Sequence, residues 1–292
     1  IAGGSHAGVG GTSGGTANPV YGSLYYPREP GSGGSASLSS GVGGYGGGAL
    51  EVTANEIENN GVIAATGQYS NGGGGGGAGG SVLLTVGILS GSGAIKANGG
   101  SSPSGAAAGG GRIAIYYQDK SLFSDANIQA FGGNMSNVTK NGGAGTIYLK
   151  KDTDTYGDLI VDNDGNDAGT GSTLLPSAAP SGDFRTYESI SGNVLTDSGA
   201  TFMPDALVGL SLSLDSDNAT PTVFTITGNT GTTIVTEQTL TGPLSAEYLG
   251  IHYFKDLLIK GSAKVQTYDR ITTTNTPSII ESGQLIKRED PQ

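Results

Sequence analysis

The sequence predicts an all-β protein: a right-handed parallel β-helix (β-solenoid) with glycine-rich loops and an inserted small antiparallel β module. Short apolar runs recur at a nearly constant spacing, they alternate and carry branched residues as strands do, and glycine-rich spacers separate them. No helical periodicity accompanies these runs. Because a two-stranded unit is marginally stable in water, we expect the units to stack on one another.

The repeat is visible in the positions at which the apolar runs begin. Four units start 32, 31 and 34 residues apart, at Leu50, Val82, Ile113 and Ile147. A second apolar run follows the first within each unit after 12 or 14 residues, at positions 62–65, 94–97, 127–130 and 159–161. Self-similarity with a period of roughly 20–50 residues indicates a solenoid. We therefore expect parallel sheets along one axis, with right-handed connections.

Residues 1–47 are a glycine-rich N-terminal segment in which the aromatic stretch 21–30 lies between two glycine-rich stretches. Its three tyrosines and two prolines predict a cap over one end of the solenoid. The alternative is a flexible linker. A further hypothesis is that the glycine spacers pack as polyproline-II-like strands, because glycine has no Cβ to prevent close approach of two backbones.

Residues 48–162 hold the four repeats. Their long spacers, 67–80, 99–111 and 132–145, should emerge from the same side and form one continuous surface, and such surfaces often bind partners. The third spacer contains two N-glycosylation sequons, at Asn134 and Asn137. Chance matches are common in such loops, and we expect both sequons to be unused.

Two octapeptides are similar, YGDLIVDN from Tyr156 and FKDLLIKG from Phe254. Their similarity predicts that the two segments occupy the same position on two successive rungs. The segment 163–253 between them is then an insertion. Its strand-like runs at 207–214, 222–227 and 232–236, with short turns, predict a small antiparallel β module. Residues 254–292 continue the solenoid, with five short rungs at 257–259, 264–267, 271–274, 278–280 and 284–286.

Composition excludes several classes of function. A net charge of −11 without a basic patch argues against nucleic acid or an anionic membrane as partner. No apolar run approaches the roughly 20 residues of a membrane-spanning helix. The absence of cysteine excludes disulfides, thiolate nucleophiles and cysteine-ligated metal sites. Since Ile1 is not a natural start, we expect the chain to be a mature or internal fragment.

Several stretches resemble a known group of proteins. GGAGGSVLLTVGILSGSGAIKANGG, GGGRIAIYY, GGAGTIYLK and YGDLIVDN resemble glycine-rich repeats of very large predicted extracellular proteins of bacteria, notably δ-proteobacteria and related groups. LTDSGATFMPDALVGLSLSLD and FTITGNTGTTI look like a small β module of the same kind of protein. The resemblance covers roughly residues 40–260. It implies a β-helical fold and an extracellular or cell-surface location, and it supplies no catalytic residues.

The best candidate for a site is an acidic cluster within residues 152–167. Asp162, Asp164 and Asp167 place oxygen ligands around a glycine turn, a pattern that suits Ca²⁺. The match to an EF-hand loop is partial, and the alternative is a solvated turn in an acidic protein. Residues 215–218 form a second, weaker candidate. The two histidines, His6 and His252, lie near no nucleophile motif, and we expect structural roles for both.

Two functions follow from this sequence. The first is a non-catalytic extracellular structural protein, a fibre, sheath or adhesin subunit whose main partner is another copy of itself. The second is a carbohydrate-active or carbohydrate-binding β-helix protein that contacts cell-surface glycans. The acidic and basic residues of such a catalytic site would include Asp154, Asp158, Arg185 and Glu188, although their spacing does not demand this role. Alignment of several of the 13 tyrosines on one face would favour sugar stacking.

Overall fold

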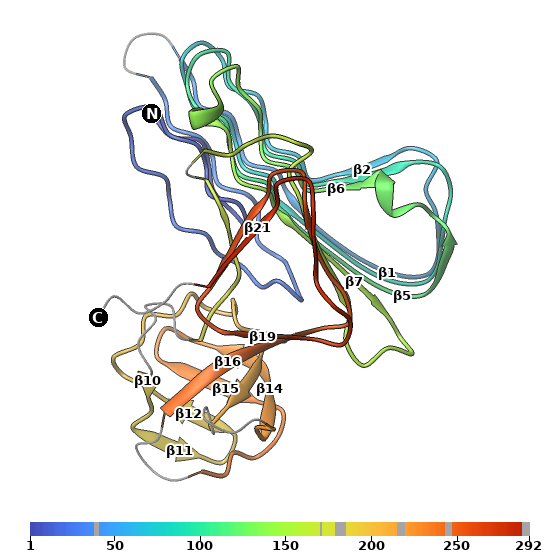
Figure 1. The fold of residues 1–292 in the computed structure, drawn as a ribbon, viewed down its shortest axis with the longest axis vertical. Coiled ribbons are helices and arrows are strands. Elements are labelled where there is room, and N and C mark those ends of the chain that lie inside the picture. Colours follow the sequence, from blue (N-terminus) through green and yellow to red (C-terminus); the bar gives the residue numbers. More distant parts are fainter. Residues whose placement is uncertain (38–40, 170, 179–184, 215–219, 243–246, 288–292) are drawn as a thin grey trace.

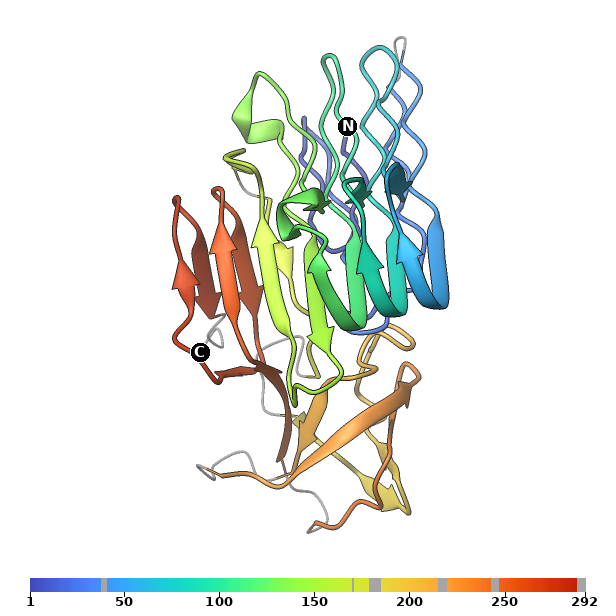
Figure 2. The same cartoon turned by 90° about the vertical axis from the view of Figure 1, so that its right-hand side faces the viewer.

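The computed structural model describes residues 1–37, 41–169, 171–178, 185–214, 220–242 and 247–287. Over these residues the protein is all-β, as predicted. Two short 3-10 helices, η1 (Asp125–Asn127) and η2 (Val138–Lys140), interrupt the strands. The strands form four sheets, and glycine-rich segments without regular strand pairing lie beside them (Figures 1 and 2).

A seven-stranded sheet, here called the long sheet, contains the first strand of each repeat. Its order is β1 (Ala49–Glu58), β3 (Ser81–Ser90), β5 (Arg112–Leu122), β7 (Thr146–Lys151), β8 (Asp158–Asp162), β17 (Leu257–Lys260) and β20 (Ser278–Ile279). Its neighbours are parallel except β7 and β8. The register aligns Leu50 with Val82, Val82 with Ile113, and Ile113 with Ile147. These are the four positions that the repeat predicted, so the predicted register is confirmed.

A three-stranded parallel sheet packs against the first part of this long sheet. It consists of β2 (Val62–Ala64), β4 (Ala94–Lys96) and β6 (Ile128–Gln129). The alternating branched residues of the two sheets meet in a buried core that includes Val82, Leu84, Ile95, Ile113, Ile115, Ile128 and Leu149. Burial of each such side chain contributes about 1.5–3 kcal/mol, and the core holds the repeats together.

The prediction for the second run of the fourth repeat is wrong. Residues 159–161 do not extend the sheet of β2, β4 and β6. They lie in β8, which turns back antiparallel beside β7. The hairpin closes because Gly157 passes directly over the Tyr148 ring and donates its N–H to the Tyr148 hydroxyl over 3.1 Å. A Cβ at Gly157 would lie 2.6 Å from that ring.

The C-terminal strands follow one another along three sides, and Figure 1 shows them in orange (β16) and red as a triangle. One turn contains β16 (Glu247–Phe254), β17 and β18 (Lys264–Thr267), and the next contains β19 (Arg270–Thr273), β20 and β21 (Gln284–Lys287). Each strand pairs in parallel with its counterpart one turn later. Short strands are thus found at all five positions predicted for residues 254–292. Leu257 pairs with Leu159, so the two octapeptides do occupy equivalent places on successive turns.

An antiparallel sheet lies within the predicted insertion. It contains β10 (Arg185–Thr186), β11 (Ser189–Ser191), β12 (Val194–Thr196), β13 (Ser211–Ser213), β14 (Val223–Asn229) and β15 (Thr233–Thr236), and β16 joins it to the C-terminal turns. Three of these strands, β13 to β15, overlap the strand-like runs seen in the sequence. The remaining short sheet pairs β9 (Thr173–Leu174) with β18 and β18 with β21.

The glycine-rich spacers form an array held by backbone hydrogen bonds. From residue 75 to residue 80, successive N–H groups donate to three neighbouring segments in turn over 2.7–3.0 Å: Gly75 and Ala78 to 32–35, Gly76 and Gly79 to 106–109, and Gly77 and Gly80 to 65–68. A return to the same neighbour every third residue is the periodicity of polyproline II. The hypothesis of polyproline-II-like packing therefore agrees with the structure, and the linker alternative does not describe residues 31–35 or 41–48, which bond to the array.

An end cap was expected for the aromatic stretch 21–30. The stretch instead lies against the outer face of the long sheet. Tyr25 is buried, its ring lies edge-on to that of Tyr148, and its hydroxyl lies 3.0 Å from Nδ1 of His252. The Ser23 hydroxyl donates to the carbonyl of Val208 in the antiparallel part over 2.8 Å. The stretch therefore joins the long sheet to the insertion. Among the described strands none pairs with the outer edge of β1.

Candidate functional site

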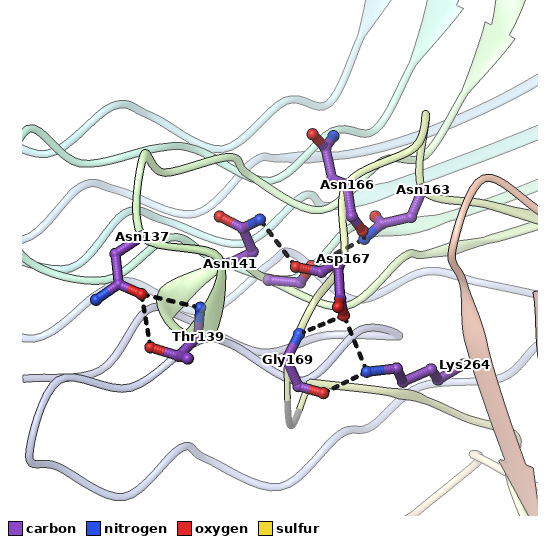
Figure 3. Close-up of polar contacts among 9 residues, drawn as sticks. Asn137, Thr139, Asn141, Asn163, Asn166, Asp167, Gly169 and Lys264 are labelled. Atoms are coloured by element: carbon purple, nitrogen blue, oxygen red, sulfur yellow. Dashed lines mark hydrogen bonds and ion pairs between the residues drawn. The ribbon is translucent and has the colours of Figure 1, made fainter. Parts of the chain in front are cut away.

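The predicted calcium turn follows β8 and faces the last turns of the chain. Asp162 pairs with Lys260 over 3.2 Å and accepts the N–H of Asp164 over 2.8 Å. Asp167 pairs with Lys264 over 3.0 Å and accepts the N–H of Gly169 over 2.9 Å (Figure 3). The Lys264 ammonium, with that N–H, lowers the pKa of Asp167. Two of the three carboxylates thus join successive turns through lysines.

Asparagine side chains fix the same turn to the glycine array. Buried Asn163 accepts the N–H of Gly132 over 2.8 Å and donates to the carbonyl of Gly142 over 3.2 Å. Asn141 donates to the carbonyl of Asp167 over 2.9 Å. Within the described ranges no group of three or more histidines and carboxylates is arranged to hold a metal ion. Calcium binding at Asp162, Asp164 and Asp167 stays a prediction, and residues 215–218 lie outside the described residues.

The four residues named for carbohydrate cleavage have separate sets of partners. Asp154 and Asp158 flank the β7–β8 hairpin, and Asp154 pairs with Lys255 over 2.8 Å. Arg185 pairs with Asp197 over 2.6 Å in the antiparallel sheet, where the hydroxyl of Tyr248 also donates to Asp197 over 2.7 Å. Glu188 in the same sheet accepts the hydroxyl of Ser198. The four residues therefore belong to two separate ion-paired clusters, whereas catalysis would need them in a single centre.

Asp158 is the unusual carboxylate of this set. Its Oδ1 is buried and has no hydrogen-bond partner. Burial, and then the negative charge of Asp256, raise the pKa of Asp158, while Lys255 opposes the shift. Sequence reasoning placed Asp158 among possible acids, but only the fold shows its partial desolvation.

Both histidines have structural contacts. His6 lies 2.8 Å through Nδ1 from the carbonyl of Gly79 and stacks on Tyr21 at 4.7 Å between ring centroids. His252 lies between the hydroxyl of Tyr25 and the carbonyl of Pro176. Burial is the main cause that lowers the pKa of His6 to about 3 and that of His252 to about 4. Both rings are therefore neutral at physiological pH.

A groove on the outer face of the long sheet was not predicted from the sequence. It has a volume of about 760 Å³, and its lining includes Thr53, Thr85, Tyr116, Tyr117, Gln118 and Lys150. Thr53, Thr85, Tyr116 and Lys150 follow one another in register across four neighbouring strands. The ring of Tyr26 stacks on that of Tyr116 at 5.4 Å. An alignment of the repeat sequences with one another would have revealed this row of side chains.

Comparison with known proteins adds no relative. No protein-family model, no curated protein and no solved structure matches the chain. Among the described residues, no helix has the length and apolarity needed to cross a membrane.

Proposed function

We propose that the protein is a non-catalytic structural protein of the cell surface or extracellular space, a subunit of a fibre, sheath or adhesin. Its scaffold is a right-handed parallel β-solenoid with an inserted antiparallel β module. The observation that carries this proposal is the open edge at each end of the parallel sheets. Within the described residues β1 and β2 end the sheets on one side, and β20 and β21 end them on the other. Unpaired strand edges are templates for pairing with another chain.

Three features support the solenoid and its location. Parallel neighbours keep the register of the sequence repeat over four strands, and the C-terminal strands repeat around three sides. The glycine array gives the spacers fixed positions, so the surface that they form is rigid enough to serve as a binding or packing face. The resemblance to glycine-rich repeats of large extracellular bacterial proteins favours the cell surface.

The chemistry of the edges favours head-to-tail association of copies. β1 carries Glu56 and Glu58, so two copies of β1 placed side by side would repel one another. Exposed apolar side chains occur at both ends: Leu50 and Val62 at one, Ile279 and Ile286 at the other. Contact between opposite ends would bury these side chains without opposing like charges. A repeated head-to-tail contact generates a filament or a ring.

Negative-stain electron microscopy of the purified protein tests this proposal. We expect filaments or sheets, and the double variant Leu50→Lys with Val62→Lys should yield dispersed particles because it places two charges in the apolar contact. Leu122→Lys is the matched control, since Leu122 is 74% exposed on β5, an interior strand of the sheet. Loss of filaments in chelator would support calcium at Asp162, Asp164 and Asp167. Dispersed particles of the unmodified protein with and without calcium would contradict self-assembly.

The alternative function is carbohydrate binding, and the groove on the outer face of the long sheet favours it. The ring of Tyr116 lies in this groove, and its threonines, Gln118 and Lys150 offer hydrogen-bonding groups beside that ring. Sugar rings stack on aromatic faces and bond to such groups. Dispersed particles that bind cell-surface glycans, with binding lost in Tyr116→Ala, would replace the structural proposal by this one.

A further inference from the structure

A small cavity lies where five parts of the chain meet, one of them the turn at Tyr268 between β18 and β19. Its volume is about 140 Å³. The N-terminal segment, the first residue of β5, the strand β9 with the residues after it, and the loop before β13 all contribute to the wall. The apolar lining includes Val20, Leu174, Pro176, Phe202, Met203 and Leu207. A cavity of about 150 Å³ holds one benzene-sized ring.

Arg112 is the one arginine or lysine that lines this cavity among the described residues. Its side chain is only 1% exposed. Nε donates to the carbonyl of Tyr21 over 3.0 Å, and Nη1 lies 3.5 Å from the hydroxyl of Thr146. No carboxylate of the described residues lies within 4.0 Å of the guanidinium, whereas six other cationic side chains have such a partner.

An unpaired guanidinium at this depth is energetically costly, because a buried charge loses its hydration and gains no compensating charge. Burial lowers the pKa of Arg112 to about 10, so the group is still charged at neutral pH. Among the described residues, Glu29 is the acid that acts on it; Glu29 lies against Gly22 on the cavity wall and compensates the charge only at a distance. An anion inside the cavity would supply the missing partner.

We propose that the cavity binds a small organic carboxylate. The carboxylate pairs with the guanidinium of Arg112, and the body of the ligand, about one six-membered ring in size, packs against Phe202, Leu174 and Val20. An arginine fork matches the two oxygens of a carboxylate, and the apolar wall excludes a ligand that is polar throughout. The proposal is independent of the self-assembly of the protein.

Methionine methyl NMR tests this proposal with an internal control. The chain has two methionines, and Met203 lines the cavity whereas Met135 does not. In protein labelled with ¹³C at the methionine methyl groups, titration with benzoate should move the Met203 signal saturably and leave the Met135 signal in place. Benzyl alcohol, which keeps the ring and lacks the charge, should bind about tenfold more weakly at matched ionic strength.

Two variants separate the charge from the space. Arg112→Gln should reduce the affinity for benzoate to that for benzyl alcohol, with an unchanged Met135 signal as evidence of folding. Ala206→Leu keeps Arg112 but fills the cavity, and it should abolish the response to both ligands even if Arg112→Gln fails to fold. An unmoved Met203 signal, equal binding of benzoate and benzyl alcohol, or the same response to sodium chloride alone would each overturn the proposal.

Discussion

At the scale of single residues, Asp158 gives the clearest pH dependence. A raised pKa means that the folded protein binds this proton more tightly than the unfolded chain does. The stabilisation that the proton provides is full below the ordinary aspartate pKa and is lost as pH rises through the folded value. Above the folded pKa the protein holds a partly buried carboxylate with an unpaired oxygen.

Asp158→Asn should consequently stabilise the protein at pH 7, by about 1 kcal/mol, because the amide removes the charge from a desolvated position. The advantage should shrink as pH falls and Asp158 of the unmodified protein becomes protonated. Urea unfolding of both proteins at several pH values measures this difference. A constant difference across the pH range would show that the charge of Asp158 is not its cause.

Residue-level features were the hardest to predict from the sequence. Arg112 stands in GGGRIAIYY without any local sign that its side chain is buried beside a cavity. Tyr25 meets His252 across 227 residues of chain, and no pattern within either segment specifies that contact. Such contacts depend on how the insertion folds back on the N-terminal segment. The aspartates of the predicted calcium turn were easy to see, but the lysines that pair with two of them are about 100 residues away in the sequence.

At the scale of elements, the strands of the repeats could be predicted closely. Their apolar residues alternate, and a shift by one residue would turn the whole apolar set away from the core, so the spacing of the units fixes the register. The same argument does not specify which neighbour a strand chooses. β8 shows this, because its apolar residues fit a core equally well in a second sheet or in a hairpin beside β7.

The glycine array is the element most sensitive to substitution. A Cβ on Gly77 would lie 1.9 Å from the carbonyl oxygen of Tyr45, which is backbone and has little freedom to move. Gly77→Ala should therefore destabilise the protein by about 2–4 kcal/mol. Gly48→Ala is the control, because nothing lies within 4 Å of a Cβ there, and its effect should stay within about 0.5 kcal/mol. Equal urea midpoints for the two variants would contradict close packing of the array.

At the scale of the whole molecule, the parts are tied together by contacts between distant segments. Residues 1–11 form hydrogen bonds with the array, and the aromatic stretch joins the long sheet to the insertion. β17 pairs with β8 and so extends the long sheet. The all-β class and the parallel pairing of the repeats could be predicted because repetition multiplies a weak local signal over several strands. The arrangement of the parts around the cavity could not, because segments that occur once supply most of its wall.

The glycine array also determines how the protein should respond to temperature. Unfolding exposes apolar surface, which raises the heat capacity, and polar surface, which lowers it. The glycine array is packed through its peptide groups, and little apolar surface is hidden there. The heat-capacity change per residue should accordingly lie below the usual value of about 12–15 cal/mol/K. The curve of stability against temperature would then be unusually flat, so that cooling weakens this protein less than one held by side chains alone.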